Sequence, residues 1–296
     1  MTLAARQCAD RQLSDSHPAD SGLTDPQVAD RHDSRHLVIL PGWALGVTPL
    51  EPLANALGQR LPGWEITLLD YATLDAPEGG RLAGHDVDTW LAALERALPD
   101  GAWLCGWSLG GMLATALAAR RVARTPGLIS LAANACFVAR PGWQTAMAVE
   151  TFDAFRQGYQ QAPVRTLGRF AQLVVQGGET QRPRRVRSAR ELAAAGAQTP
   201  PDQALAGLAL LEALDLRARL GRLSVPQLHL FAADDALVPC GACDAVAECL
   251  PASGRAERIA AAGHAFPLAR ATETAERIAT FITSSRAERA DAGGQP

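Results

Sequence analysis

The chain has 296 residues, of which 48% are apolar and 20% are charged, as in an ordinary globular protein with room for a large core. A formal net charge of −3 and a pI near 6.1 give no reason to expect nucleic-acid binding. No apolar run suits a membrane span or a secretory signal, and six scattered cysteines are too few for a disulfide framework. We therefore expect a soluble, cytoplasmic protein.

The first 35 residues are polar, and aspartate recurs every fifth residue from Asp10 to Asp30. Such a segment lacks the apolar surface needed to offset the entropy of ordering, so we predict a disordered tail over residues 1–35. Folded structure is predicted to begin at His36–Leu40, a short apolar run that ends at Pro41-Gly42. A continuous apolar run of this length is typical of a strand buried on both faces.

From there, strand and helix patterns alternate, which favours a mostly parallel sheet flanked by helices. Between residues 139 and 222 the pattern changes to helical segments only, and we predict an inserted all-helical cap. The core is then formed by residues 36–138 and 223–284, and residues 285–296 are expected to fray. The predicted strands are 36–40, 64–70, 102–106, 127–133, 225–232 and 255–260, and the predicted core helices are 51–59, 85–97, 111–121, 244–250 and 272–282.

A candidate nucleophile lies between the third predicted strand and the helix after it. Gly106-Trp-Ser108-Leu-Gly110 fits the G-x-S-x-G elbow, in which a serine occupies a strained turn and glycines leave room on either side. The pentapeptide occurs by chance, but the apolar strand before it and the Ala/Leu-rich helix after it are the expected context. We predict that Ser108 is the nucleophile.

The general base must come from six histidines. Three lie in or beside the polar tail, one starts a helix well before the elbow, and His229 falls inside a strand and reads as a packed core residue. His264 follows the last predicted strand, where an imidazole can reach a serine at the carboxyl edge of the sheet. We predict His264 as the base.

The acid that orients this base is expected at the end of the strand 225–232. Asp234 and Asp235 both lie there, and Asp235 is preferred because it stands three residues before Val238-Pro239. The order Ser, Asp, His along the chain is that of α/β hydrolases. For the oxyanion hole we predict the backbone N–H groups of Leu109 and of Trp43, which follows Pro41-Gly42.

Several segments together resemble the pimeloyl-[acyl-carrier protein] methyl ester esterases of biotin biosynthesis, within the α/β-hydrolase superfamily. They span roughly residues 37–270 and are 40–45, 106–111, 133–137 with 139–143, 165–170, 207–217 and 261–266. This resemblance implies hydrolysis of a methyl ester on a pimeloyl chain attached to acyl-carrier protein, with release of methanol. It also implies that Trp43, Leu45, Trp107 and Phe170 line the acyl tunnel.

The same resemblance implies that Arg165, Arg169 and Arg182 face the carrier and its phosphopantetheine arm. At one further position where these relatives carry an arginine, this chain has Val186, so that contact is not expected here. Charge supports a basic cap independently: residues 139–222 hold 12 Arg against 7 acids, and all 28 basic residues of the chain are arginine. A solvated helical face is the alternative explanation of such a charge run.

We therefore expect a monomeric enzyme that acts on a carrier-bound or small-molecule ester, with no cofactor or metal and no contact with nucleic acid or membrane. Two alternatives stay open. One is a general short-chain carboxylesterase or a C–C bond hydrolase on the same scaffold, because a fold does not determine the chemistry of its pocket. The other is a non-catalytic small-molecule receptor. Cys240 and Cys243 have C-x-x-C spacing but no second pair, so we predict no metal site there.

Overall fold

The structure of the protein, a computed structural model, describes residues 34–293 except 77–78, 81, 83–85 and 179–181. The side chains of residues 182–184, 186, 292 and 293 are also outside the description. The polar tail predicted over residues 1–35 therefore lies almost wholly outside the described residues.

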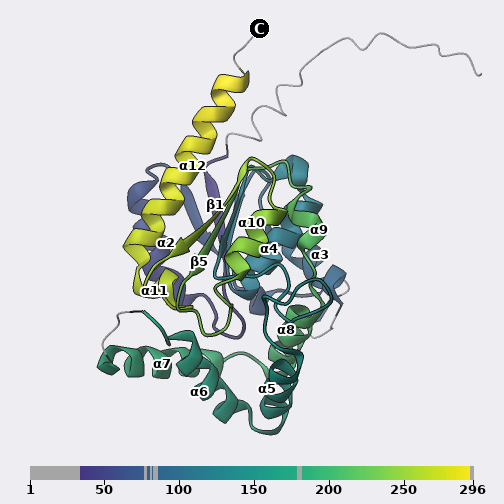
Figure 1. Ribbon diagram of the computed structural model, residues 1–296. Coiled ribbons are helices and arrows are strands. Elements are labelled where there is room, and N and C mark those ends of the chain that lie inside the picture. The colour runs from purple at the N-terminus through teal and green to yellow at the C-terminus, as the bar shows by residue number, and fades with distance from the viewer. Residues whose placement is uncertain (1–33, 77–78, 81, 83–85, 179–181, 294–296) are drawn as a thin grey trace, which may run out of the picture.

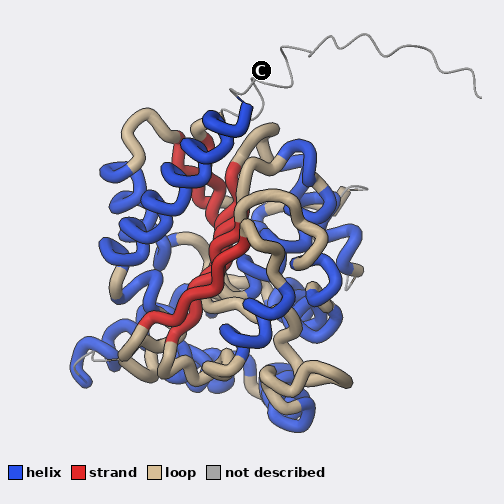
Figure 2. The backbone as a smooth tube through the Cα atoms, turned by 45° about the horizontal axis from the view of Figure 1, so that its top comes forward, coloured by secondary structure: helices blue, strands red, loops and turns tan. Residues whose placement is uncertain are grey.

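A single sheet of six parallel strands forms the centre of the fold, in the order β2-β1-β3-β4-β5-β6. Figure 2 shows it as a twisted layer between two layers of helices. The strands are β1 (His36–Leu40), β2 (Glu65–Leu68), β3 (Trp103–Trp107), β4 (Leu128–Leu131), β5 (Gln227–Ala232) and β6 (Gly254–Ile259).

Helices cover both faces of the sheet, as right-handed crossovers between parallel strands require (Figure 1). Helices α2 and α12 pack together on one face, and α3, α4, α9 and α10 lie on the other. The core helices are α2 (Glu51–Arg60), α3 (Val87–Ala97), α4 (Leu109–Arg120), α10 (Ala242–Cys249), α11 (Phe266–Ala269) and α12 (Ala271–Gly293), with short 3-10 turns η1 (Thr48–Leu50), η2 (Tyr71–Thr73) and η3 (Val122–Arg124).

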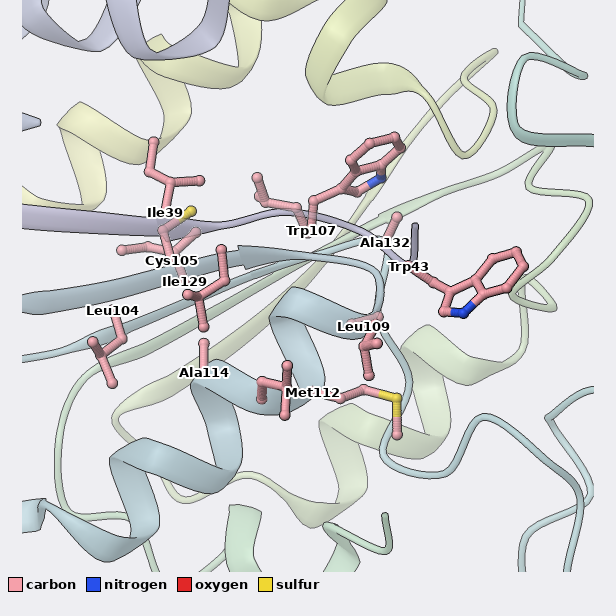
Figure 3. Packing of buried hydrophobic residues seen from close by; sticks show 14 of the residues in the cluster. Ile39, Trp43, Leu104, Cys105, Trp107, Leu109, Met112, Ala114, Ile129 and Ala132 are labelled. Atoms are coloured by element: carbon pink, nitrogen blue, oxygen red, sulfur yellow. The ribbon is translucent and has the colours of Figure 1, made fainter. Parts of the chain in front are cut away.

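The central strands are buried along their whole length, which explains why their sequences are continuous apolar runs. In Figure 3, Cys105 and Trp107 of β3 lie on the same side of the sheet as Ile39, whereas Leu104 lies on the side of α4 with Ala114. This alternation packs both layers of helices against one sheet. Because the strands are parallel, the carboxyl ends of β1, β3 and β5 lie at one edge of the sheet.

Between β4 and β5 the regular elements of the described residues are all helices, joined by loops that contain two isolated bridges. We call residues 139–222 the cap segment; its helices are α5 (Val149–Gln161), α6 (Pro163–Val174), α7 (Arg182–Gly196), α8 (Pro201–Ala213) and α9 (Arg217–Leu220). Helices α5, α6 and α7 lie beyond one end of the sheet (Figure 1).

Both ends of the cap segment meet at one polar cluster. The Arg217 guanidinium donates to the Asp215 carboxylate at 2.9 and 2.6 Å and to the carbonyl of Pro141 at 2.9 Å. These hydrogen bonds from Arg217 hold the pKa of Asp215 down to about 2. The Cys136 thiol donates to the same carboxylate at 3.4 Å. Because Cys136 lies just before the cap segment, this hydrogen bond ties the cap segment to the core.

The observed boundaries lie within two residues of the sequence-based expectation, except at the end of α12. Helix α4 begins at Leu109, directly after Ser108, rather than at residue 111. Helix α12 runs to Gly293, where we expected the chain to fray beyond residue 284. Arginine side chains account for this extension: Arg286 covers the Trp64 ring and Arg289 covers the Trp103 ring, each 5.4 Å from the centroid. A search for apolar periodicity misses a helix that packs through arginine stems.

None of the helices in the described part of the chain combines the length and apolar character that a membrane crossing requires.

Candidate active site

Ser108 occupies a strained turn between β3 and α4. Its φ of 56° and ψ of −121° lie where non-glycine residues are rare. Its N–H donates to the carbonyl of Leu131 at 2.8 Å, which ties the turn to β4. The side chain is almost fully covered, with 7% of its surface exposed. A strained turn between a strand and a helix is the geometry that a G-x-S-x-G elbow requires.

The glycines around Ser108 are required by close backbone contacts. A Cβ on Gly106 would overlap the carbonyl of Gly110, and a Cβ on Gly110 would overlap the carbonyl of Leu40. A Cβ on Gly111 would come within 2.7 Å of the Ala133 Cβ. The strand, the turn and the start of α4 can therefore approach each other only without side chains at these positions.

His264 and Asp235 form a buried pair at the carboxyl ends of the last two strands. Nδ1 of His264 lies 2.8 Å from Oδ2 of Asp235, and both side chains are 1% exposed. The other carboxylate oxygen accepts the N–H groups of Leu237 and Val238 at 2.8 and 3.0 Å. Asp235 is thus held by two backbone donors, and its hydrogen bond to Nδ1 fixes the orientation of the imidazole ring.

The second imidazole nitrogen is buried and finds no hydrogen-bond partner among the described residues. The residue before Ser108 meets the histidine directly: the Trp107 indole N–H donates to the His264 carbonyl at 3.0 Å, and the two rings lie 5.7 Å apart. The structure therefore brings the elbow and the His264 loop together. In such sites the bond from histidine to nucleophile often closes only with substrate bound.

The competing residues lie elsewhere. Asp234 is exposed, and its backbone packs against Gly177 of the cap segment. His229 is buried in β5, bonded to the Gln227 side chain at 3.3 Å, and burial lowers its pKa to about 4. His36 pairs with Thr67 at the sheet edge. The other three histidines fall outside the described residues.

The proposed oxyanion donors flank the elbow. A Cβ on Gly42 would lie 3.5 Å from the Ser108 Cβ, so the turn that contains Trp43 faces the nucleophile. Leu109 is the first residue of α4, where an N–H has no acceptor within its own helix. Neither the Trp43 nor the Leu109 N–H donates a backbone hydrogen bond outside the helices and strands of the described chain.

The four residues predicted to line an acyl tunnel are all buried, at 7% exposure or less. Trp43 meets Phe170 of the cap segment edge-on, with centroids 4.9 Å apart. The side chains of Leu45 and Trp107 both lie close to Gly42. These residues thus surround the turn beside Ser108.

Two of the three arginines predicted to face the carrier have side chains within the described residues. Arg165 and Arg169 are exposed on α6, and no described carboxylate pairs with either. The side chain of Arg182 lies outside the described residues.

A cavity of about 460 Å³ lies between the end of α6, helix α7 and the His264 loop. Gln176, Arg185, Gly263 and Phe266 are among its lining residues, but Ser108 is not. It therefore borders the loop that carries His264 without opening onto the nucleophile.

The sequence gives no signal for two residues that brace this site. Tyr71 donates to the Gly42 carbonyl at 2.8 Å, and Gln203 of α8 donates to the Ala72 carbonyl at 2.8 Å. No motif marks either residue, because each acts through a contact between segments far apart in sequence.

Among the described residues, no group of three or more His, Cys, Asp or Glu side chains could hold a metal ion. Cys240 is exposed, Cys243 is buried, and the described cysteines are free thiols.

Comparisons with known proteins agree with this architecture. A family model described as alpha/beta hydrolase fold matches residues 35–270. Among solved structures, a bromoperoxidase from Bacillus anthracis and an esterase from Exiguobacterium antarcticum each superpose with a TM-score of 0.72. They are 18% and 20% identical, and cover 84% of this chain and 92% and 91% of their own chains. At these identities the likeness shows the fold alone.

Sequence relatives are more informative. A pimeloyl-[acyl-carrier protein] methyl ester esterase of Aromatoleum aromaticum is 36% identical over 219 residues, 71% of this chain and 84% of that protein. The enzyme of the same name from Nitrosomonas europaea is 32% identical over 70% of this chain and 80% of its own. A biotin biosynthesis bifunctional protein BioHC of Cellvibrio japonicus is 35% identical over 71% of this chain, and the match spans 40% of that longer protein. The chain therefore belongs to the alpha/beta hydrolase fold family, as a carboxylic ester hydrolase related to the pimeloyl-[acyl-carrier protein] methyl ester esterases.

Proposed function

We propose that this enzyme hydrolyses the methyl ester of a pimeloyl group attached to acyl-carrier protein, with Ser108, His264 and Asp235 as its catalytic residues. The observation that carries the proposal is the buried Asp235–His264 pair beside a strained serine elbow. The names of the relatives at 32% and 36% identity supply the substrate.

In the proposed reaction, the Ser108 hydroxyl attacks the ester carbonyl while Nε2 of His264 takes its proton. The tetrahedral intermediate collapses to an acyl-enzyme, and His264 returns the proton to methanol as it leaves. Water, deprotonated by His264, then attacks the acyl-enzyme and frees the carboxylic acid and the serine. Asp235 holds the imidazole so that Nδ1 carries its hydrogen toward the carboxylate, which leaves Nε2 able to accept a proton.

The negative oxygen of each intermediate needs preorganised donors. The N–H groups of Leu109 and Trp43 would supply them, since both residues flank the elbow and neither N–H has an acceptor in the surrounding backbone network. One such donor is worth about 10²–10³ in turnover.

An acidic carrier would find its complement on α6. Arg165 and Arg169 are one turn apart and exposed, and Val164 beside them is 78% exposed. From Arg156 to Arg190 the chain has eight arginines and one acid. This surface supports the carrier as a partner, because unpaired guanidinium groups attract carboxylates and phosphate.

The direct test is hydrolysis of methyl pimeloyl-carrier by the purified enzyme. The reaction is monitored through the methanol released and through the mass of the carrier. We expect kcat/KM for this substrate to exceed that for free methyl pimelate and for short p-nitrophenyl esters. Ser108→Ala should abolish the activity. Equal or better hydrolysis of the small esters would instead indicate a general carboxylesterase.

A second test asks whether the gene restores growth without biotin to a bacterium that lacks its own pimeloyl-carrier esterase. Wild-type should restore growth and Ser108→Ala should not. Growth with the serine variant would contradict the assigned nucleophile.

A further inference from the structure

The turn that contains the proposed oxyanion donor is fastened by a buried tyrosine. The phenol of Tyr71 donates to the carbonyl of Gly42 at 2.8 Å, and Tyr71 is 5% exposed. This carbonyl and the N–H of Trp43 belong to the same peptide group. Because a peptide group is planar, a bond that fixes its carbonyl also fixes the direction of its N–H.

A hydrogen bond to the carbonyl has a second effect. It polarises the peptide and strengthens the N–H as a donor at the opposite end. The phenol keeps its proton for this role, because burial, and then the negative charge of Asp70, raise the pKa of Tyr71 well above its ordinary value.

Helix α8 of the cap segment braces the same turn. Gln203 Nε2 donates to the carbonyl of Ala72, the residue after Tyr71, at 2.8 Å. In the next residue, the Ala204 carbonyl accepts the Trp43 indole N–H at 2.7 Å. Two consecutive residues of one cap helix thus hold both the tyrosine turn and the side chain of Trp43.

One turn further along α8, Gly207 lies against the side chains of both residues whose N–H groups are the proposed donors. A Cβ there would lie 2.7 Å from Trp43 Cδ1 and 3.5 Å from Leu109 Cδ2. Figure 3 shows the Trp43 and Leu109 side chains on neighbouring segments at the end of the sheet. The cap helix therefore contacts the residues on either side of the nucleophile.

We infer that Tyr71 and Gln203 are positioning residues: Tyr71 aims the Trp43 N–H at the oxyanion, and α8 holds Tyr71 and Trp43 in place through Gln203 and the Ala204 carbonyl. The cap segment thereby contributes to transition-state stabilisation as well as covering the site. This inference rests on the proposed serine chemistry at Ser108, and it does not depend on which acyl group is cleaved.

The test compares Tyr71→Phe and Gln203→Met with wild-type on p-nitrophenyl butyrate. Active sites are titrated with a fluorophosphonate, so that kcat refers to competent enzyme only. We expect kcat to fall about tenfold in each variant, as loss of one orienting hydrogen bond predicts, with KM within about twofold. Affinity for a trifluoromethyl ketone, which forms an oxyanion on Ser108, should fall by the same factor as kcat.

A stability measurement and a control variant distinguish a positioning role of Tyr71 and Gln203 from a merely structural one. The Oε1 atom of Gln203 is buried without a partner among the described residues. Gln203→Met loses the hydrogen bond to the Ala72 carbonyl but also removes this unsatisfied oxygen, so we expect the two effects to offset each other and the melting temperature to stay nearly unchanged. The chain's other tyrosine, Tyr159, also packs edge-on against Trp43, with centroids 5.5 Å apart, but among the described residues it is the phenol of Tyr71, and not that of Tyr159, that donates to this turn. Tyr159→Phe is the matched control and should keep kcat within about twofold.

Unchanged kcat per titrated site in Tyr71→Phe would overturn the inference, as would a loss of kcat without loss of ketone affinity. An equal loss in Tyr159→Phe would overturn it too. Ser108→Ala in the same assay tests the proposed function separately: full activity of that variant would reject the serine mechanism, whatever Tyr71→Phe shows.

Discussion

The Asp235 carboxylate lies 2.8 Å from Nδ1 of His264, while its other oxygen accepts two backbone N–H groups. The adjacent Asp234 is exposed, and the carboxylate that hydrogen-bonds to the imidazole is that of Asp235. The chain therefore offers two neighbouring aspartates, of which one orients the histidine.

This pair gives a matched comparison. Asp235→Asn keeps the shape of the side chain but can stabilise the wrong imidazole tautomer, so we expect kcat to fall by about 10⁴ with little change in KM. Asp234→Asn, one residue away, should keep kcat within about twofold. Both are measured on p-nitrophenyl butyrate, with circular dichroism to check folding. A large loss in Asp234→Asn, with an active Asp235→Asn, would reverse the assignment.

The parts of the site that the sequence predicts are those set by local rules. Ser108 is marked by the glycines that its turn requires, and His264 by its place after the last strand of a parallel sheet. Strand position alone does not distinguish Asp235 from Asp234, because neighbouring residues at the end of one strand differ mainly in the direction of their side chains. The Val-Pro turn favoured Asp235, and the buried hydrogen bonds to Leu237 and Val238 give the physical reason.

What the sequence does not predict comes from contacts over long separations. Gln203 meets Ala72 across 131 residues, and the Trp43 indole meets Ala204 across 161. The extension of α12 through Arg289 is of the same kind, since Arg289 bonds to the Pro126 carbonyl. Such pairs form when helices and strands that are distant in the sequence pack against each other. Local sequence propensities do not predict which residues then meet.

Two glycines should respond oppositely to alanine. Gly58, inside α2, has open space where a Cβ would be placed, so Gly58→Ala should raise the free energy of unfolding by about 0.5–1 kcal/mol. In Gly106→Ala the new methyl would overlap the Gly110 carbonyl, and we expect loss of the folded enzyme. Urea unfolding measures both. Neutral behaviour of Gly106→Ala would contradict the close contact between β3 and the start of α4.

His229 should make stability depend on pH. Burial holds its folded-state pKa down to about 4, below an unfolded-state value of about 6.5. The folded protein therefore prefers neutral His229, whose contribution is fully present above about pH 6.5 and is lost as pH falls toward 4. The loss is about 3 kcal/mol for this residue. His229→Gln removes this titration, so the free energy of unfolding of the variant should fall less between pH 6.5 and 4 than that of wild-type. Equal pH dependence of the unfolding free energy in the two proteins would show that His229 does not have a lowered pKa.

The exposed arginines of α6 should govern recognition of a carrier-bound substrate. Arg165 and Arg169 have no carboxylate partner in the described chain, and each exposed contact with an acidic carrier is worth about 0.2–1 kcal/mol. The double change Arg165→Gln/Arg169→Gln should therefore raise KM for methyl pimeloyl-carrier between about twofold and thirtyfold, and weaken the dependence of kcat/KM on salt.

Arg222→Gln is the matched control: it removes one charge from an exposed arginine beyond α9 and should leave both quantities as in wild-type. An equal loss by the double variant on p-nitrophenyl butyrate would show that the change acts on the fold, and an unchanged KM and salt dependence on the carrier substrate would remove α6 from the carrier interface.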